Sequence, residues 1–510
     1  MRMDMTLHES CWTCRNRHVQ CDRSQMPCAK CQKAGLECLK KLPFRWVKGV
    51  AIRGNMQGHT YENNSAAPVT KPKRFRFKSS GGKAAGRRSA ISMITHSPIP
   101  SPRKRVIHSL SSMLILNVTD NKRLCANFVV YDSDKNHLRK LIPLALQNPI
   151  LSKVILALAA RHLANHGQKF GSNLSEALLL PETMKHDRDA LLFKHQAISG
   201  LSNALGDPKQ CYKDINLASV FLLVLLDLLE SGGEEWQVHL RGAKSLITSS
   251  FRQPPPDNST KQESTHVIQD TRDFVIQQIV LIDTLGSIFP RPKSPSQELT
   301  LGQTGMAQDS IEYSFLACPE LLRSAIRSIS RERDSAAGCG IFHGTDVQAY
   351  IQAILVVVTL TENFDCVSWA SRLQQPRHTC EDIHFLAVVA QVYKIATLLY
   401  GRRVISALEK KNISQDELII ELLGLLNSLK DRQELLKCVL WPVFVAGLEC
   451  RSPEQKQFFI SRLEEFWMTT NCLNVINAAK ILQEYWSRDD WESICWAFDV
   501  GRFGQAWLLI

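Results

Sequence analysis

Six cysteines lie within the first 38 residues, and their spacing constrains the fold more than any other feature of the chain. They are Cys11, Cys14, Cys21, Cys28, Cys31 and Cys38. Each of the two Cys-x-x-Cys pairs can clamp one metal ion, and zinc favours four thiolate ligands in a tetrahedron. Two separate four-cysteine sites would need more sulfurs than this segment has. The spacing therefore predicts one compact cluster of two metal ions that share two thiolates.

A disulfide framework is the competing explanation for these cysteines. Such frameworks are typical of small secreted domains, whereas this chain has 510 residues and its first residues show no charged-then-apolar signal pattern. The other ten cysteines are scattered singly, as in proteins of a reducing compartment. We expect those ten to be small buried hydrophobic residues, with redox sensing as the alternative role.

Positive charge is concentrated at one end of the chain. Residues 1–105 contain 22 Lys and Arg but only 5 Asp and Glu, whereas the remaining residues contain 40 basic and 44 acidic side chains. A basic segment beside a metal-held fold favours a polyanionic partner, because binding releases the counterions of that partner. Taken alone, the charge would fit a solvated basic tail equally well.

The cysteine segment is too short to bury a hydrophobic core, so metal binding must supply its folding energy. We expect one short helix at residues 12–19 and a second at residues 29–34. Gly35 directly follows the second helix and is suited to a C-cap.

Three stretches carry a family resemblance: residues 11–22 (CWTCRNRHVQCD), 27–31 (PCAKC) and 35–38 (GLEC). Together they resemble the fungal zinc binuclear cluster (Zn2Cys6) DNA-binding domain. The resemblance implies two zinc ions per chain, with Cys11 and Cys28 as the shared ligands. One zinc ion would also be bound by Cys14 and Cys21, and the other by Cys31 and Cys38.

The same resemblance implies double-stranded DNA as a partner. In this family the first helix points its end into the major groove, and the basic residues shortly before the third cysteine contact a CGG triplet; here those positions are Arg17 and His18. Four further basic residues are interpreted as phosphate contacts, which position the protein without specifying sequence. They are Arg15, Arg23, Lys30 and Lys33. The alternative for all of these residues is a solvated basic surface.

Two positions depart from the usual family pattern. Gln20 stands directly before the third cysteine, where Lys is common, so one DNA contact is in doubt. Pro27 directly precedes Cys28 instead of standing one residue earlier, which affects the loop and not the ligands.

The composition divides the chain into residues 1–45, a linker at 46–125 and a large region at 126–510. The linker is rich in Lys, Arg, Gly, Ser and Pro, and we expect it to be disordered. Its basic runs at 71–78, 87–88 and 103–105 are candidate nuclear localisation signals, which would make the import machinery a partner and the nucleus the location.

The region 126–510 is dense in Leu, Ile, Val and Ala with helical spacing, so we predict an all-α domain. Four of its segments resemble the fungal-specific transcription factor domain, a helical regulatory region. They are 141–145 (LIPLA), 156–160 (LALAA), 236–243 (WQVHLRGA) and 441–447 (WPVFVAG). The resemblance implies effector sensing, dimerisation or transcriptional control.

Several helix starts can be placed within this region. Asn148 before Pro149 predicts an N-cap for a helix that runs to Gly167. Ser414 with Glu417, and Ser452 with Gln455, fit capping boxes.

Residues 220–229 are apolar but too short to span a membrane, and we interpret them as a core helix and expect no membrane partner. The C-terminal residues from Trp486 onward mix acidic and aromatic side chains, which fits either an activation segment or the last helix of the domain. No sustained heptad repeat follows the cysteine cluster. A homodimer would need another interface, and monomeric binding to one triplet stays open.

The chain shows no motif typical of an enzyme. His162 and His166 have a ligand-like spacing, but Leu163 occupies the position where a zinc protease needs Glu. Phosphate-binding Gly-rich loops and nucleophile elbows are not found in the sequence. We therefore expect a non-enzymatic, nuclear regulator of RNA polymerase II genes that binds CGG-like triplets and engages the transcription machinery. The alternative is a zinc-dependent, DNA-associated chromatin or repair accessory protein.

Overall fold

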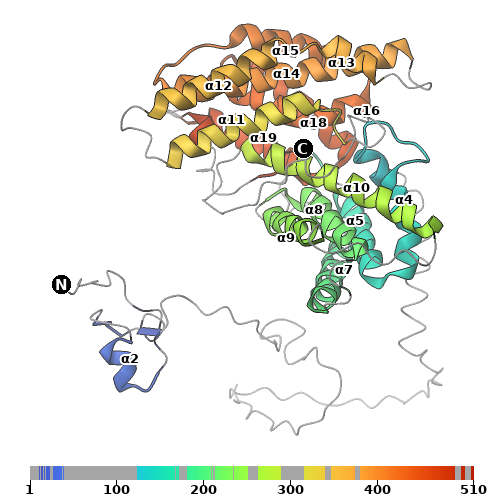
Figure 1. Cartoon of the computed structure of the whole chain (residues 1–510), viewed down its shortest axis with the longest axis vertical. Helices are drawn as coiled ribbons and strands as arrows, with labels where there is room; N and C mark the ends of the chain where they lie inside the picture. The colour runs from blue at the N-terminus through green and yellow to red at the C-terminus, as the bar shows by residue number, and fades with distance from the viewer. Residues whose placement is uncertain are drawn as a thin grey trace, which may run out of the picture. The chain divides into compact units, whose positions relative to one another are not determined.

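The computed structural model describes residues 11, 13–14, 17, 19–22, 27–36, 38, 123–166, 168–171, 181–207, 210, 213–233, 235–250, 262–288, 315–338, 346–373, 379–488, 495–499 and 507–509. The chain divides into two compact units, Met1–His96 and Ser97–Ile510. All secondary structure among the described residues is helical (Figure 1), which confirms the predicted fold class. Most of the predicted linker, residues 46–122, lies outside the described residues.

The small unit contains helix α2 (Ala29–Lys33). The first half of the large unit contains α4 (His137–Gln147), α5 (Pro149–His166), α7 (Pro181–Gly206), α8 (Asp214–Glu230), α9 (Glu235–Ser250), α10 (Gln262–Leu285) and the short 3-10 helix η1 (Gly286–Ile288). The second half contains α11 (Glu320–Gly338), α12 (Asp346–Glu362), α13 (Cys366–Arg372), α14 (Cys380–Leu408), α15 (Asp416–Ser428), α16 (Gln433–Leu436), η4 (Lys437–Val439), α17 (Leu440–Glu449), α18 (Pro453–Thr470), α19 (Leu473–Trp486) and α20 (Trp496–Asp499).

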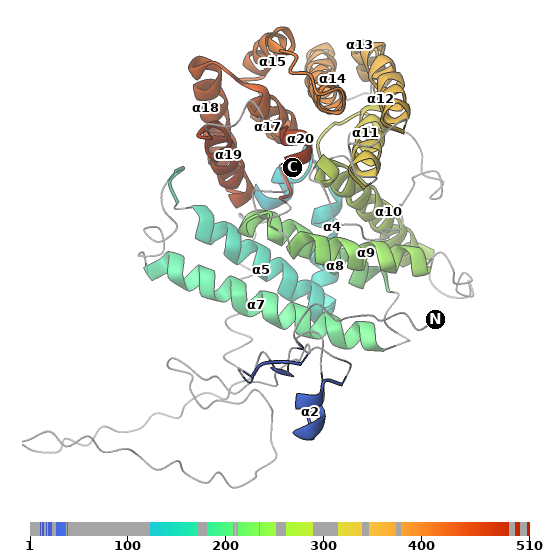
Figure 2. The ribbon, with the colours of Figure 1, turned by 90° about the vertical axis from the view of Figure 1, so that its left-hand side faces the viewer.

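The helices of the large unit form two groups that share one hydrophobic core. Helices α5, α7, α8 and α9 pack side by side, while α11 to α15 and α17 to α20 form the second group (Figure 2). Helix α10 packs on both α8 and α11, and α19 packs on α8, so these helices join the two groups. The core is continuous between them.

Helix α14 is the central element of the second group, and it contacts α11, α12, α13, α15, α17 and α20. It is long and apolar enough to cross a membrane, but 72% of its most apolar window is buried within the unit. The predicted core helix at residues 220–229 lies inside α8, where every residue from Asn216 to Leu229 is buried. Neighbouring helices therefore cover the apolar surfaces of α8 and of most of α14.

The predicted helix starts can be checked by their caps. The Asn148 side chain accepts hydrogen bonds from the backbone N–H groups of Ile150 and Leu151, both at 3.0 Å, so this N-cap is confirmed. Ser452 and Gln455 form the predicted capping box at the start of α18.

The capping box predicted at Ser414 is wrong. Helix α15 begins at Asp416, and its N-cap residue is Gln415 and not Ser414. Glu417 is therefore the second residue of the helix, whereas a capping box needs Glu or Gln at the third. The Ser414 hydroxyl instead donates to the Asp416 carboxylate at 2.6 Å.

The C-terminal aromatic residues pack into the core. Trp496 is fully buried, stacks on Tyr400 with ring centroids 5.8 Å apart, and donates its indole N–H to the Glu449 carboxylate. The backbone N–H of Leu508 donates to the Gly232 carbonyl at 2.7 Å. These contacts support the reading of this segment as the end of the helical domain.

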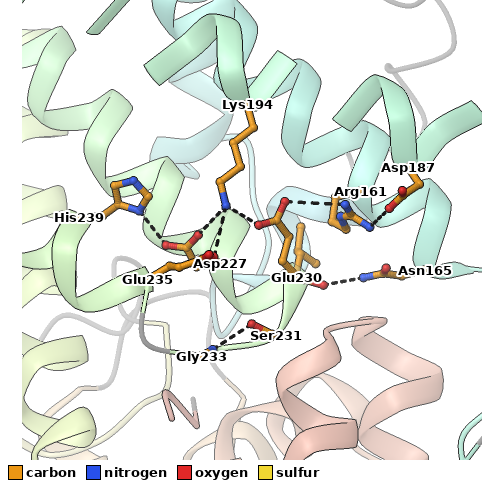
Figure 3. Close-up of polar contacts among 11 residues, drawn as sticks. Arg161, Asn165, Asp187, Lys194, Asp227, Glu230, Ser231, Gly233, Glu235 and His239 are labelled. Carbon is orange, nitrogen blue, oxygen red and sulfur yellow. Dashed lines mark hydrogen bonds and ion pairs between the residues drawn. The ribbon is translucent and has the colours of Figure 1, made fainter. Parts of the chain in front are cut away.

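A polar network joins four helices of the first group (Figure 3). Asp227 on α8 is 1% exposed; it accepts from Lys194 of α7 at 3.1 Å and lies 2.7 Å from the Nδ1 of His239 on α9. Arg161 of α5 lies 3.8 Å from Glu230, which also pairs with Lys194. The network therefore links α5, α7, α8 and α9 through paired charges, which is the condition under which buried charges are tolerated.

Candidate metal centre and nucleic-acid interface

The two Cys-x-x-Cys pairs adopt matching local geometry. The backbone N–H of Cys14 donates to the Cys11 sulfur at 3.3 Å, and the N–H of Cys31 donates to the Cys28 sulfur at 3.4 Å. Thr13 and Cys14 are helical, and Cys28 is the N-cap residue of α2. A helical turn after the first cysteine of each pair thus turns both sulfurs toward the same point.

The six sulfurs form two overlapping groups of four. Within each group all sulfurs lie within 4.8 Å of one another, and both groups contain Cys11 and Cys28. The first group is completed by Cys14 and Cys21, the second by Cys31 and Cys38.

The distances between these sulfurs match a zinc–thiolate cluster. The Cys11 and Cys28 sulfurs are 3.8 Å apart, and the Cys14 and Cys28 sulfurs are 3.6 Å apart. Sulfurs that surround one zinc ion tetrahedrally at 2.3 Å would be about 3.8 Å apart. Two zinc ions therefore fit this donor set.

Burial opposes the ionisation of two of these thiols, Cys14 and Cys31. Burial raises the pKa of Cys14 to about 12, and the hydrogen bonds with Cys11 and Cys28 contribute in the same direction. Burial also raises the pKa of Cys31. Because zinc binds the thiolate form, metal binding must displace these protons. The donor set is thus chemically suited to divalent ions that offset its negative charge.

Gly35 ends the second short helix as predicted. Helix α2 covers Ala29–Lys33, Gly35 has φ +62°, and the N–H of Leu36 donates to the Cys31 carbonyl at 3.0 Å. The left-handed conformation favours glycine because a Cβ would be strained there.

Asp22 makes a contact that the cysteine pattern does not predict. Its carboxylate accepts a hydrogen bond from the backbone N–H of Ala29, the first residue of α2, at 2.8 Å. The sequence does contain a signal for this contact. Asp22 is an acidic residue that directly follows a ligand cysteine and precedes a helix start, where acidic groups are favoured.

The first helix is shorter than predicted. Thr13 and Cys14 are helical, whereas Arg17 lies in a turn, and Val19 and Gln20 are outside the helix. The N–H groups of Arg17 and Val19 both reach the Cys14 carbonyl, at 3.2 and 3.1 Å. These bonds hold the backbone of Arg17 and Val19 next to Cys14.

Of the predicted DNA-contacting residues, Arg17, Lys30 and Lys33 are exposed. Lys30 and Lys33 lie on α2, and the Arg17 backbone is held by the turn that contains Cys14. Arg15, His18 and Arg23 lie outside the described residues.

The cysteines elsewhere in the described chain form no disulfides. Cys125, Cys318, Cys366, Cys438, Cys450 and Cys472 are buried, as predicted for small hydrophobic residues. Burial raises the pKa of Cys125 to about 12 and that of Cys438 to about 12, which suppresses thiolate formation. Cys380 is exposed.

Among the described residues of the large unit, one further group of ligand-type side chains lies close together: Asp227, Glu230 and Glu235. Lys194 lies 3.7 Å from Glu235 and pairs with the other two acids, so its ammonium group supplies the positive charge at this point. His162 is buried and His166 is exposed, so they do not share a surface.

Comparison with known proteins adds two family matches. The family model described as the fungal Zn(2)-Cys(6) binuclear cluster domain matches residues 9–46. The model described as the fungal specific transcription factor domain matches residues 121–510, which include Leu124 and Cys125 of the helical core.

A curated relative is the acriflavine sensitivity control protein acr-2 of Neurospora crassa, which is 27% identical over 387 residues. The match covers 72% of this chain and 61% of the relative, so the chain corresponds to about three fifths of the relative's length. No solved structure matches the chain.

Proposed function

Because the chain belongs to the fungal specific transcription factor domain family, we propose that it is a DNA-binding transcriptional regulator that acts in the nucleus on RNA polymerase II genes. The observation that carries this proposal is the pair of four-sulfur groups sharing Cys11 and Cys28. Such a cluster folds a segment too short to fold alone and makes it a rigid DNA-binding unit. The proposed activity is binding and not catalysis.

In this proposal the two zinc ions are held by Cys11, Cys14, Cys21, Cys28, Cys31 and Cys38. The ions supply folding energy, and the residues around them make the contacts to DNA. Arg17 donates bidentately to guanine in a CGG-like triplet, together with His18. The residues proposed to contact phosphates are Arg15, Arg23, Lys30 and Lys33.

Support for nucleic acid as the partner comes from charge. Arg17, Lys30 and Lys33 are exposed, and residues 1–105 hold 22 of the 62 basic side chains against 5 acidic ones. The basic runs at 71–78, 87–88 and 103–105 are proposed to recruit the import machinery. The helical unit is proposed to engage the transcription machinery.

A binding-site selection on the purified full chain tests the proposal. Selected DNA should share a CGG-like triplet. The logarithm of the association constant should fall linearly with the logarithm of the salt concentration. Two triplets at fixed spacing would indicate a homodimer on DNA, and one triplet a monomer. Selection of no common sequence would reject sequence-specific regulation, and diffuse or damage-dependent occupancy in cells would favour an accessory protein of chromatin or repair.

A further inference from the structure

A pocket lies where the first described residues of the helical unit meet helices α17, α18 and α19. It offers about 440 Å³ of space, counting its opening to solvent, which is in the size range of small-molecule sites. Its polar lining includes Asn127 and Lys437, and its apolar lining includes Phe128, Phe315 and Phe466. None of the described residues that line it is Asp or Glu. The pocket therefore combines one cation with an apolar wall.

The cation of this pocket has no counter-ion among the described residues. The Lys437 ammonium group donates to the backbone carbonyl of Ala126 and forms no ion pair there. Asp132 and Glu434 act on it only through space, and each of them pairs with an arginine. Burial lowers the pKa of Lys437, although these two carboxylates act in the opposite direction. An ammonium group has three donors, so this one can also bind an anionic acceptor.

The other polar groups of the pocket are neutral. The Asn127 side chain donates one amide N–H to the Thr470 carbonyl at 3.2 Å, and its second amide N–H can donate to a ligand. Burial raises the pKa of Cys472 to about 12, so this thiol carries no charge at neutral pH. No negative charge on the lining residues thus opposes the entry of an anion.

Aromatic rings form much of the apolar wall. Phe128, Phe315 and Phe466 are all buried, and the rings of Phe128 and Phe315 lie 5.8 Å apart between centroids with a tilt of 40°. Aromatic rings pack favourably against each other in tilted or offset arrangements at such distances. A ligand with an aromatic ring would extend this arrangement.

Two residues beside the pocket have left-handed backbone conformations although they are not glycine. Ala317 has φ +48° and follows Leu316, which lines the pocket. Asn471 has φ +52° and lies between Thr470 and Cys472, which both line it. Such conformations persist only where surrounding contacts hold them, and they are concentrated at ligand-binding sites.

We propose that this pocket binds a small aromatic monocarboxylate. Lys437 and Asn127 donate hydrogen bonds to its carboxylate, and the three phenylalanine rings contact its aromatic ring. A doubly charged anion such as phosphate fits less well, because a single ammonium group would leave one of its charges uncompensated beside an apolar wall. This inference concerns the helical unit and does not rest on DNA binding, so either proposal can fail without the other.

Isothermal titration calorimetry of the zinc-loaded full chain tests the proposal without DNA. The native chain should bind phenylacetate, and it should bind phenylacetamide, an uncharged molecule of similar shape, at least about tenfold more weakly. Failure to bind phenylacetate, or equal affinity for the two compounds, would overturn the proposal. Equal affinity for hexanoate would overturn the assignment of an aromatic ring.

Lysine variants test which cation binds the carboxylate. Lys437→Met should weaken phenylacetate binding by about ten- to hundredfold, whereas Lys437→Arg should retain most of it. Lys153→Met is the matched control, because Lys153 on α5 is also partly buried, with its ammonium group 4.9 Å from the centre of the Phe193 ring. Native affinity in Lys437→Met, or equal losses in the Lys437→Met and Lys153→Met variants, would overturn the role of Lys437.

Cysteine labelling of the native chain locates the ligand without any variant. Phenylacetate should slow the modification of Cys472 by methyl methanethiolsulfonate, as measured by peptide mass spectrometry. Cys450 is the control, because it is also buried but does not line the pocket. Its rate should stay unchanged. An unchanged rate at Cys472, or equal slowing at both cysteines, would overturn the proposed location.

Discussion

The carboxylate of Asp22 accepts a hydrogen bond from the backbone N–H of Ala29 at 2.8 Å, and this contact ties the two halves of the cysteine cluster together. Asp22 follows Cys21 of the first four-sulfur group, and Ala29 follows the shared Cys28. The backbone N–H of Ala29, the first residue of α2, therefore has a hydrogen-bond acceptor from outside its own helix.

Replacing Asp22 with Ala should loosen the cluster without removing a ligand. The lost hydrogen bond should cost about 1 kcal/mol of cluster stability, which is a typical net value for one hydrogen bond. Competition with a zinc chelator measures the loss as weaker zinc retention. Asp22→Asn keeps an acceptor oxygen and should retain most of the affinity, and equal effects of the two variants would contradict a hydrogen-bonding role.

The shared and terminal cysteines should differ in how many zinc ions they control. Cys28→Ala removes a sulfur from both four-sulfur groups, so the chain should lose both ions. Cys38→Ala affects one group and should leave up to one ion bound. Zinc content per purified chain, measured by mass spectrometry under native conditions, distinguishes these results. Two ions retained by Cys28→Ala would refute the shared site.

Two basic residues of the small unit should contribute differently to DNA binding. Arg17→Ala should lower the preference for the selected triplet by about 1–3 kcal/mol, because a bidentate guanine contact has this value. Lys30→Ala should weaken binding to all sequences alike and reduce the salt slope by about one unit. Binding isotherms at several salt concentrations on matched and mutated sites separate the two roles. If the two variants behave alike, the assigned division between base and phosphate contacts is wrong.

Two adjacent arginines of α14 should differ strongly in their effect on stability. Arg403 pairs with Glu449, whose side chain is 1% exposed, so Arg403→Met leaves a buried carboxylate without its cation. The free energy of unfolding should fall by about 3–5 kcal/mol. Arg402 forms an exposed pair with Glu362, and Arg402→Met should cost about 0.5 kcal/mol or less. Urea denaturation at one protein concentration measures the free energy of unfolding of both variants. Similar losses would show that the burial of Glu449 does not determine the cost of removing its arginine.

Two glycines provide a test of packing. A Cβ at Gly286 would lie 2.4 Å from the ring of the fully buried Trp236, so Gly286→Ala should destabilise the helical unit by about 1–3 kcal/mol. A Cβ at Gly424 in α15 would meet no atom within 4 Å. Gly424→Ala should therefore be neutral or stabilise by up to about 1 kcal/mol, because alanine favours helix. Thermal unfolding of both variants gives the comparison, and destabilisation by Gly424→Ala would contradict it.

The cysteine cluster could be predicted from sequence because its geometry is local. The spacing within the first 38 residues limits which sulfurs can meet, and two overlapping four-sulfur groups are what the structure shows. The helix starts at Asn148 and Ser452 were predictable for the same reason, since an N-cap acts within four residues. Ser414 shows the limit of such patterns, because its hydroxyl donates a hydrogen bond to the neighbouring carboxylate of Asp416 and does not cap the helix.

The sequence alone therefore determined the metal cluster, the basic end of the chain and the helical class, because these depend on spacing, charge and periodicity within short windows. Tertiary structure decided the rest. It placed Trp496 against Glu449, 47 residues earlier, and left Val356 and Leu360 of α12 exposed. Both outcomes depend on which distant helices bury each other's surfaces, and that competition for burial cannot be read from neighbouring residues.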